Sequence, residues 1–255
     1  MALLFALPAK AEAQEIMGAG PLGMGRAVTA LPGTPWALFL NPAMLSGERQ
    51  AAFYGIQNYR MPELMDASAV IVHPVSFGTL ALGHHNYGNE LFSKNRTRLG
   101  YKLKSRGLHA GLVLNYSHVS IASYGSKGAL GVDLGIAASP AEGLWFGASA
   151  NNVNRPRIGT DLPRRLTIGF SYRMAERAVV TSDLVKDIAF PLAYRGGVEI
   201  ELVEHFFART GITTEPTTYS AGFGVALAGK YALNLAVRHH ALLSWSPGLD
   251  IMVKW

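Results

Sequence analysis

LHAGLVLNYSHV, residues 108–119, alternates two kinds of side chain. Every second residue from Leu108 to Tyr116 is apolar or aromatic, whereas the residues between them include His109 and Asn115. Strict alternation indicates a β-strand whose two faces meet different surroundings. Here it lasts for nine or ten residues, which is the length a tilted strand needs to cross a bilayer. The stretch therefore predicts a membrane-spanning strand.

The same period recurs along most of the chain. It is clearest in residues 130–138, 164–173, 194–202, 219–227 and 231–237. From Gln50 to Trp255 we count fourteen strands, which begin near residues 50, 66, 78, 97, 108, 128, 144, 164, 178, 194, 206, 219, 230 and 247. Alternation is blurred in 66–73, 78–87 and 178–186, so a count of twelve stays open. The pattern predicts an all-β fold, a transmembrane antiparallel up-and-down β-barrel of about 14 strands.

The expected connections alternate between short and long. Short turns are predicted near residues 73–77, 104–107, 139–143, 174–177, 203–205 and 228–230. Longer loops are predicted at 60–65, 88–96, 120–127, 154–163, 187–193, 214–218 and 241–247. Outer-membrane barrels have short periplasmic turns and longer outer loops. We therefore expect a barrel in the outer membrane of a Gram-negative-type bacterium, surrounded by outer-membrane lipids and with both termini periplasmic.

The chain ends on an aromatic residue. In GLDIMVKW, residues 248–255, Leu249, Ile251, Val253 and Trp255 share one face. This end resembles the C-terminal signal that the barrel-assembly machinery recognises in outer-membrane proteins. It implies that this machinery is a partner through Trp255. A terminal strand of a soluble barrel is the alternative interpretation of these residues taken alone.

The first thirteen residues have the features of a secretory signal peptide whose basic start is missing. A short apolar run, residues 2–9, precedes Ala11-Glu12-Ala13, and cleavage is expected before Gln14. A short buried helix is the alternative. Beyond residue 13, every stretch of about 18 residues contains a charge, His or Pro, which argues against a transmembrane helix.

Composition excludes several classes of function. Cysteine is absent, so disulfide and thiol chemistry are excluded. The formal charge is +6, but the basic residues are scattered singly rather than in runs, which does not favour nucleic-acid binding. Gly18 to Gly23 has the spacing of a dinucleotide fingerprint without the required strand and helix. Adjacent His residues, at 84–85 and 239–240, point to opposite faces of a strand and cannot chelate one metal together. We predict no enzyme activity, cofactor or metal site.

Residues 17–47 differ from everything after them. They are rich in Gly and Pro, carry one charge (Arg26), and show no sustained period. An apolar run, Trp36 to Leu40, ends at Asn41-Pro42, a pair that stops the run and turns the chain. Such a segment is costly to leave in water because its apolar side chains and backbone groups need partners. We expect residues 14–48 to plug the lumen of a barrel made by residues 49–255.

The barrel face opposite the apolar one carries the charges. These are Arg98, Lys102, Asp133, Arg165, Arg173, Arg195, Glu199, Glu201, Arg209, Arg238, Asp250 and Lys254. An excess of basic groups predicts a lumen that attracts anions or an acidic head group. A network of Arg–carboxylate pairs that fills a narrow barrel is the alternative, and the sequence favours it because buried charges are normally paired.

The opening segment also carries a family resemblance. Gly23-Met24-Gly25-Arg26-Ala27, followed after a gap by the stretch from Trp36 to Leu45, WALFLNPAML, resembles the N-terminal signature of FadL-like outer-membrane proteins, closest to the PorV/PorQ branch. The resemblance implies transport of small hydrophobic or amphipathic molecules across the outer membrane. The candidate ligand-binding residues of plug and lumen are Arg26, Trp36, Phe39, Leu40, Asn41, Pro42, Arg165, Arg195, Arg209 and Arg238.

The PorV/PorQ branch implies a second hypothesis. The chain would then be a structural or interaction component of a type IX secretion complex or another outer-membrane complex. Loops 88–96 and 154–163 would form the contact surface for the partner protein.

Overall fold

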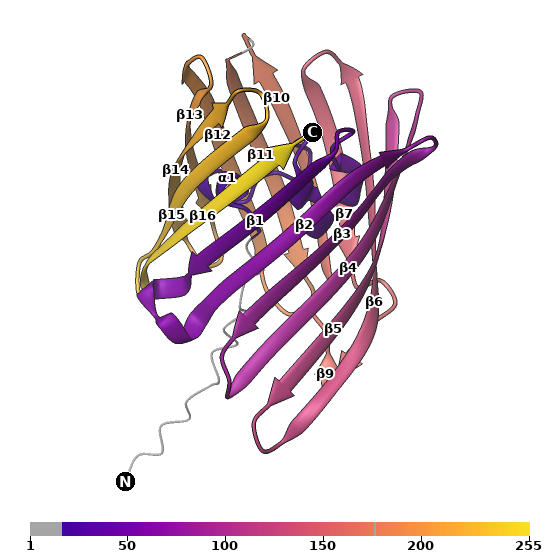
Figure 1. Cartoon of the computed structure of the whole chain (residues 1–255), viewed down its shortest axis with the longest axis vertical. Helices are drawn as coiled ribbons and strands as arrows, with labels where there is room; N and C mark the ends of the chain where they lie inside the picture. The colour runs from indigo at the N-terminus through magenta and orange to yellow at the C-terminus, as the bar shows by residue number, and fades with distance from the viewer. Residues whose placement is uncertain (1–16, 176) are drawn as a thin grey trace.

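The structure, a computed structural model, describes residues 17–175 and 177–255. The predicted signal peptide, residues 1–13, lies outside these ranges. Within them, fourteen antiparallel strands close into one barrel, sealed where β1 pairs with β16 (Figure 1). The barrel strands are β1 (Gln50–Gln57), β2 (Met65–Val75), β3 (Gly78–Gly88), β4 (Phe92–Ser105), β5 (Leu108–Ile121), β6 (Gly125–Ala141), β7 (Leu144–Asn151), β10 (Arg165–Met174), β11 (Ala178–Asp187), β12 (Leu192–Val203), β13 (Phe206–Thr213), β14 (Thr218–Leu227), β15 (Tyr231–His240) and β16 (Ser244–Lys254). The predicted fold class and the count of fourteen are confirmed.

The loop predictions at 88–96 and 120–127 are wrong. Strand β4 already begins at Phe92, and Ile121 of β5 pairs with Gly125 of β6, so only a few residues remain as turns. The alternation fades there while the backbone ladder continues, because both faces of a strand that extends beyond the apolar zone are polar. The 154–163 loop contains a separate hairpin, made by β8 (Arg157–Ile158) and β9 (Thr160–Asp161).

The outer surface of the wall is apolar. In β5, Leu112 and Leu114 are 42% and 49% exposed, whereas Val113 between them is fully buried. Exposed apolar side chains recur on nearly every strand, and a surface of this kind needs a lipid environment. Among the described residues, no helix is long and apolar enough to cross a membrane.

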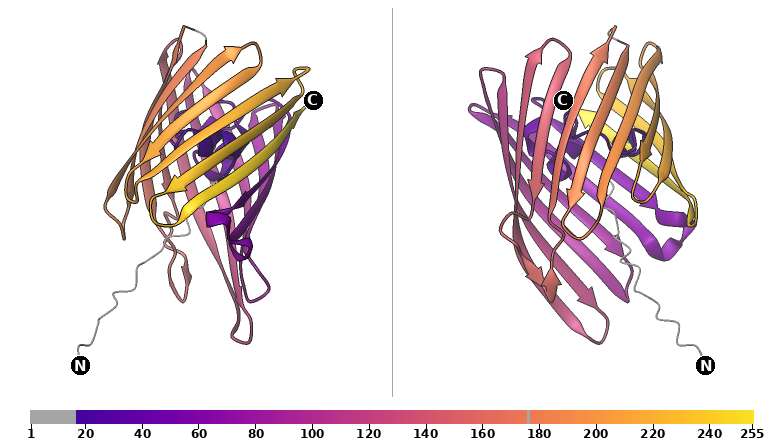
Figure 2. Two further views of the ribbon diagram at one scale, coloured as in Figure 1. Left: turned by 90° about the vertical axis from the view of Figure 1, so that its left-hand side faces the viewer. Right: turned by 180° about the vertical axis from the view of Figure 1, so that it is seen from behind.

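Residues 17–47 occupy the inside of the barrel and are called the plug below. The plug contains α1 (Ala19–Gly23) and two short 3₁₀ helices, η1 (Pro35–Phe39) and η2 (Pro42–Met44). Figure 2 shows these turns enclosed by the strands, nearest the end of the barrel where the C-terminus lies. The connections between strands at that end are two or three residues long, and it is called the short-turn end; the other end, which carries all the longer connections, is called the long-loop end. Side chains cap the two 3₁₀ helices, because Thr34 and Asn41 accept hydrogen bonds from the amides of Trp36 and Ala43.

Glycines on the inner wall allow the plug to lie against the strands. If a Cβ atom were added at any of these glycines, its distance to the nearest plug atom would be between 2.1 and 2.7 Å. This glycine belt consists of Gly83, Gly100, Gly111, Gly135, Gly147, Gly197 and Gly211. The unusually high glycine content of the chain is therefore partly a consequence of the plug, because only glycine permits such close backbone approach.

Candidate functional site

Charged and polar wall residues fasten the plug. The carboxylate of Asp250 accepts hydrogen bonds from the amides of Ala19, at 2.6 Å, and Gly20, at 3.3 Å. Asp183 accepts from both the amide and the hydroxyl of Thr29, at 3.1 and 2.7 Å. Further hydrogen bonds run from Arg98 to the Leu38 carbonyl, Lys102 to Leu45, Ser171 to Ala30 and Thr213 to Gly25. The plug is thus tied to strands all around the barrel.

A cavity of about 740 Å³ lies between the plug and the long-loop end. Its floor is made by the plug residues Arg26, Thr29, Phe39 and Leu40. Its walls come from β4, β7, β10, β11 and β12, together with segments 160–164 and 188–190. The volume is typical of a site for a drug-sized ligand.

The lining of this cavity is strongly cationic. Of the described residues that line it, seven are cationic and two are carboxylates. The cationic residues are Arg26, Lys94, Arg96, Arg98, Arg164, Arg165 and Arg195, and the carboxylates are Asp161 and Asp187. Arg26, Arg96, Arg98 and Arg195 are each at most 5% exposed, so their charges are held away from bulk water.

Some of these charges are paired within the fold. Arg98 lies 3.2 Å from Asp133, and Arg165 lies 3.7 Å from Asp187. Ion pairs of the kind that one hypothesis for the inner charges predicts therefore occur in the lumen, and the attraction of anions stays a prediction.

Apolar groups complete the lining. Phe39, Leu40, Leu162, Pro163, Ile188 and Phe190 contribute to the cavity surface. The guanidinium of Arg98 lies 5.2 Å from the centre of the Phe39 ring, a cation–π arrangement. A molecule in this cavity would meet an aromatic floor and basic walls together.

Arg26 has an unusual backbone. Its φ is 65°, in the left-handed region, where a residue with a side chain costs about 1–2 kcal/mol relative to a right-handed conformation. Glycine would avoid this cost. The arginine side chain at this position instead adds a buried charge to the cavity floor.

The structure separates the predicted ligand-binding residues into two groups. Arg26, Phe39, Leu40, Arg165 and Arg195 all line the cavity. Ligand contact by these residues remains a prediction.

The plug residues Trp36, Asn41 and Pro42 lie outside the cavity lining. Trp36 is fully buried and packs on Tyr54, with ring centroids 5.8 Å apart. The Asn41 amide donates to the carbonyls of Thr29 and Ile136, and the Pro42 ring lies against the glycine belt. These contacts hold the plug in place.

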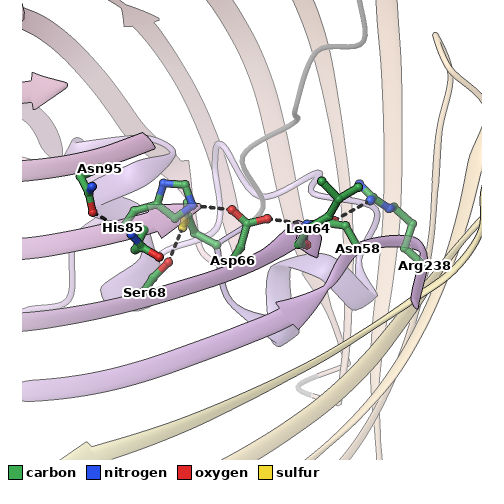
Figure 3. Close-up of polar contacts among 9 residues, drawn as sticks. Asn58, Leu64, Asp66, Ser68, His85, Asn95 and Arg238 are labelled. Atoms are coloured by element: carbon green, nitrogen blue, oxygen red, sulfur yellow. Dashed lines mark hydrogen bonds and ion pairs between the residues drawn. The ribbon is translucent and has the colours of Figure 1, made fainter. Parts of the chain in front are cut away.

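Arg209 and Arg238 also lie outside the cavity lining. Arg209 donates to Glu199 at 2.6 Å and to Asn234 at 2.7 Å. Arg238 donates to the side-chain oxygen of Asn58 at 3.1 Å, at one end of a buried polar chain. In Figure 3 this chain continues through Asp66 to His85, whose Nε2 lies 2.6 Å from an Asp66 oxygen.

Four cavity cations, Lys94, Arg96, Arg98 and Arg164, are absent from the predicted ligand-binding residues, and of these only Arg98 is among the predicted inner charges. Lys94, Arg96 and Arg98 occupy alternate positions of β4 and therefore face the same side. The alternation of basic residues in KNRTR, residues 94–98, is the signal that could have identified this row. The incorrect loop prediction for 88–96 concealed it.

No family model and no curated protein matches this chain. Solved structures do match its fold. The CymD monoaromatic hydrocarbon channel is 13% identical, with a TM-score of 0.69 over 92% of this chain and 98% of that one. The Ralstonia pickettii toluene transporter TbuX is 11% identical, with a TM-score of 0.70 over 94% and 97%. A Pseudomonas aeruginosa FadL homologue is 10% identical, with a TM-score of 0.61 over 91% and 96%. The chain thus has the barrel fold of FadL-like hydrocarbon channels.

Proposed function

We propose that this protein carries small hydrophobic or amphipathic molecules across the outer membrane. The observation that supports this most directly is a cavity with apolar and charged lining inside a barrel whose outer surface is apolar. The long-loop end would face outward and the termini would be periplasmic, as in other outer-membrane barrels. Trp255 is 58% exposed, so it is accessible to lipid and to the barrel-assembly machinery.

The route follows from the position of the plug. A ligand enters at the long-loop end and is held above Phe39 and Leu40. The plug lies below this position and contacts the wall through the glycine belt. Onward passage therefore needs a shift of the plug or an opening between strands.

Proteoliposomes test this function. Uptake of a labelled fatty acid or a small aromatic hydrocarbon should be several-fold faster than into empty liposomes. Phe39→Ala should slow it, because Phe39 supplies aromatic surface to the cavity floor. Heat-modifiable gel migration shows that the barrels in the liposomes are folded. If such barrels give uptake no faster than empty liposomes, the proposal is contradicted.

The secretion-component hypothesis remains a separate proposal. The hairpin within segment 154–163 contributes Thr160 and Asp161 to the cavity lining, which favours a role in ligand access over one in docking a protein. Recovery of a secretion translocon with the tagged, membrane-extracted protein would support the secretion role.

A further inference from the structure

The plug has a thin place below the cavity, and we propose that ligands leave the cavity through it. There, Thr29 to Leu31 and Leu40 form a septum between the cavity and the short-turn opening, and the side chains of Leu31 and Leu40 set the size of what passes. This inference rests on the proposed transport function, and it assigns the exit to the plug rather than to an opening between strands.

The depth of the septum follows from the chain itself. Thr29 lines the cavity floor, whereas Leu31, two residues later, is not among the described lining residues and is still partly exposed. The exposed part of Leu31 therefore faces a space other than the cavity. Because two residues of extended chain span at most about 7 Å, the plug separates these two spaces by little more than one layer of side chains.

The second space lies toward the short-turn end. Leu31 packs against a small apolar cluster that includes Val179, the second residue of β11, and β11 begins at the short-turn end. The chain stays near the surface after Leu31, because Pro32 and Thr34 are partly exposed and Gly33 is exposed. No atom lies within 4 Å of a Cβ added at Gly33, so this part of the plug borders open space.

Leucine side chains close the septum from both sides. Leu40 lines the cavity, and Leu31 is partly exposed on the far side. Both pack against one apolar cluster, which consists of Met24, Val28 and Val179. An apolar constriction excludes hydrated ions, because it offers no polar partner in place of water, whereas an apolar ligand loses no hydrogen bonds there. The septum thus favours the passage of apolar molecules over polar ones.

Hydrogen bonds hold the backbone part of the septum. The amide and the hydroxyl of Thr29 donate to Asp183, at 3.1 and 2.7 Å. The Ser171 hydroxyl donates to the Ala30 carbonyl at 2.8 Å. The two leucine side chains, in contrast, are held by apolar contacts and are partly exposed. The smallest movement that opens the septum is therefore a rotamer change of these leucines, with the rest of the plug in place.

Ion conductance across planar lipid bilayers tests the septum without any transported ligand. Leu31→Ala and Leu40→Ala should each raise the conductance of the barrel several-fold above that of the unmodified protein, because each widens the apolar constriction. Leu38→Ala is the matched control for the same change of side chain. Leu38 is fully buried in the same plug, packs against Gly83 and Gly100 of the wall and does not line the cavity. Its substitution should leave the conductance unchanged.

Leu31→Trp tests the route that a ligand takes. The larger side chain should slow the uptake of a labelled aromatic hydrocarbon into proteoliposomes several-fold, because it narrows the septum without changing the cavity lining. Heat-modifiable gel migration shows whether each variant is folded. If Leu31→Trp does not fold, Leu31→Phe replaces it in the same assay.

The outcomes separate the septum from the transport function. Folded Leu31→Ala and Leu40→Ala barrels with the conductance of the unmodified protein would overturn the septum. Uptake through Leu31→Trp at the unmodified rate would also overturn it, because the ligand would then leave by another route, and the transport function would stand. If the unmodified protein gives no uptake, the transport function is contradicted, and the conductance of the alanine variants still decides whether the septum closes the lumen.

Discussion

A Gly135→Val substitution is expected to displace the plug and open the lumen to small hydrophilic solutes. A Cβ atom at position 135 would lie 2.1 Å from the Asn41 side-chain oxygen and 2.8 Å from the Pro42 ring. The valine side chain would therefore overlap with both plug residues. Moving Asn41 away would break its hydrogen bonds to the carbonyls of Thr29 and Ile136. Liposome swelling in a small sugar should therefore rise clearly above that of the unmodified protein, because a barrel of this size without its plug encloses an aqueous channel.

Gly55→Val provides the control for this experiment. Gly55 lies in β1, and the nearest atom to an added Cβ there is the Asp66 carbonyl oxygen, at 3.9 Å. This variant should fold and swell like the unmodified protein. A folded Gly135→Val barrel with unchanged swelling would show that the plug does not close the lumen.

Trp36→Ala is expected to destabilise the protein by about 3–5 kcal/mol, the usual cost of removing a large buried aromatic side chain. Trp36 is fully buried and packs against the rings of Phe39 and Tyr54. It also lies against Gly18, since a Cβ atom added at Gly18 would be 2.4 Å from the Trp36 ring. Urea unfolding of the reconstituted barrel, followed by circular dichroism, measures the loss. Cavity binding should change less than in Phe39→Ala, because Phe39 lines the cavity and Trp36 does not.

Trp245→Ala is the matched comparison for the same change of side chain. Trp245 is 43% exposed on β16, so its removal leaves no enclosed void and should cost less free energy. The packing of the plug implies that it stabilises the barrel. If Trp36→Ala is no more destabilising than Trp245→Ala, that implication is wrong.

The barrel could be predicted from sequence because lipid and lumen impose opposite demands on alternate residues. Predicted and observed strand starts agree to within a few residues along the chain, including 50, 78, 108, 144, 178 and 206. The prediction failed at the long-loop end of β4, β5 and β6, where the contrast between the two faces disappears.

The candidate site was harder to predict for two physical reasons. The plug has no period, so sequence cannot tell that Phe39 faces the cavity while Trp36, three residues earlier, is covered by Tyr54. The alternation of inward- and outward-facing residues along each strand correctly placed four arginines inside the barrel, namely Arg165, Arg195, Arg209 and Arg238. It carries no information on where along and around the barrel a side chain lies, and that position decides that the first two reach the cavity while the others lie in separate polar networks.

The fastening of the plug has a consequence for biogenesis. Ala19 is hydrogen-bonded to Asp250, 231 residues later, so the segment made early finds one of its partners only in the closing strand. Contacts of such wide sequence separation form late, because the chain between them must first be ordered. The hydrogen bond between Ala19 and Asp250 can therefore form only once β16, the last strand in the chain, is present. The same strand closes the barrel by pairing with β1, so closure of the wall and this attachment of the plug depend on one segment.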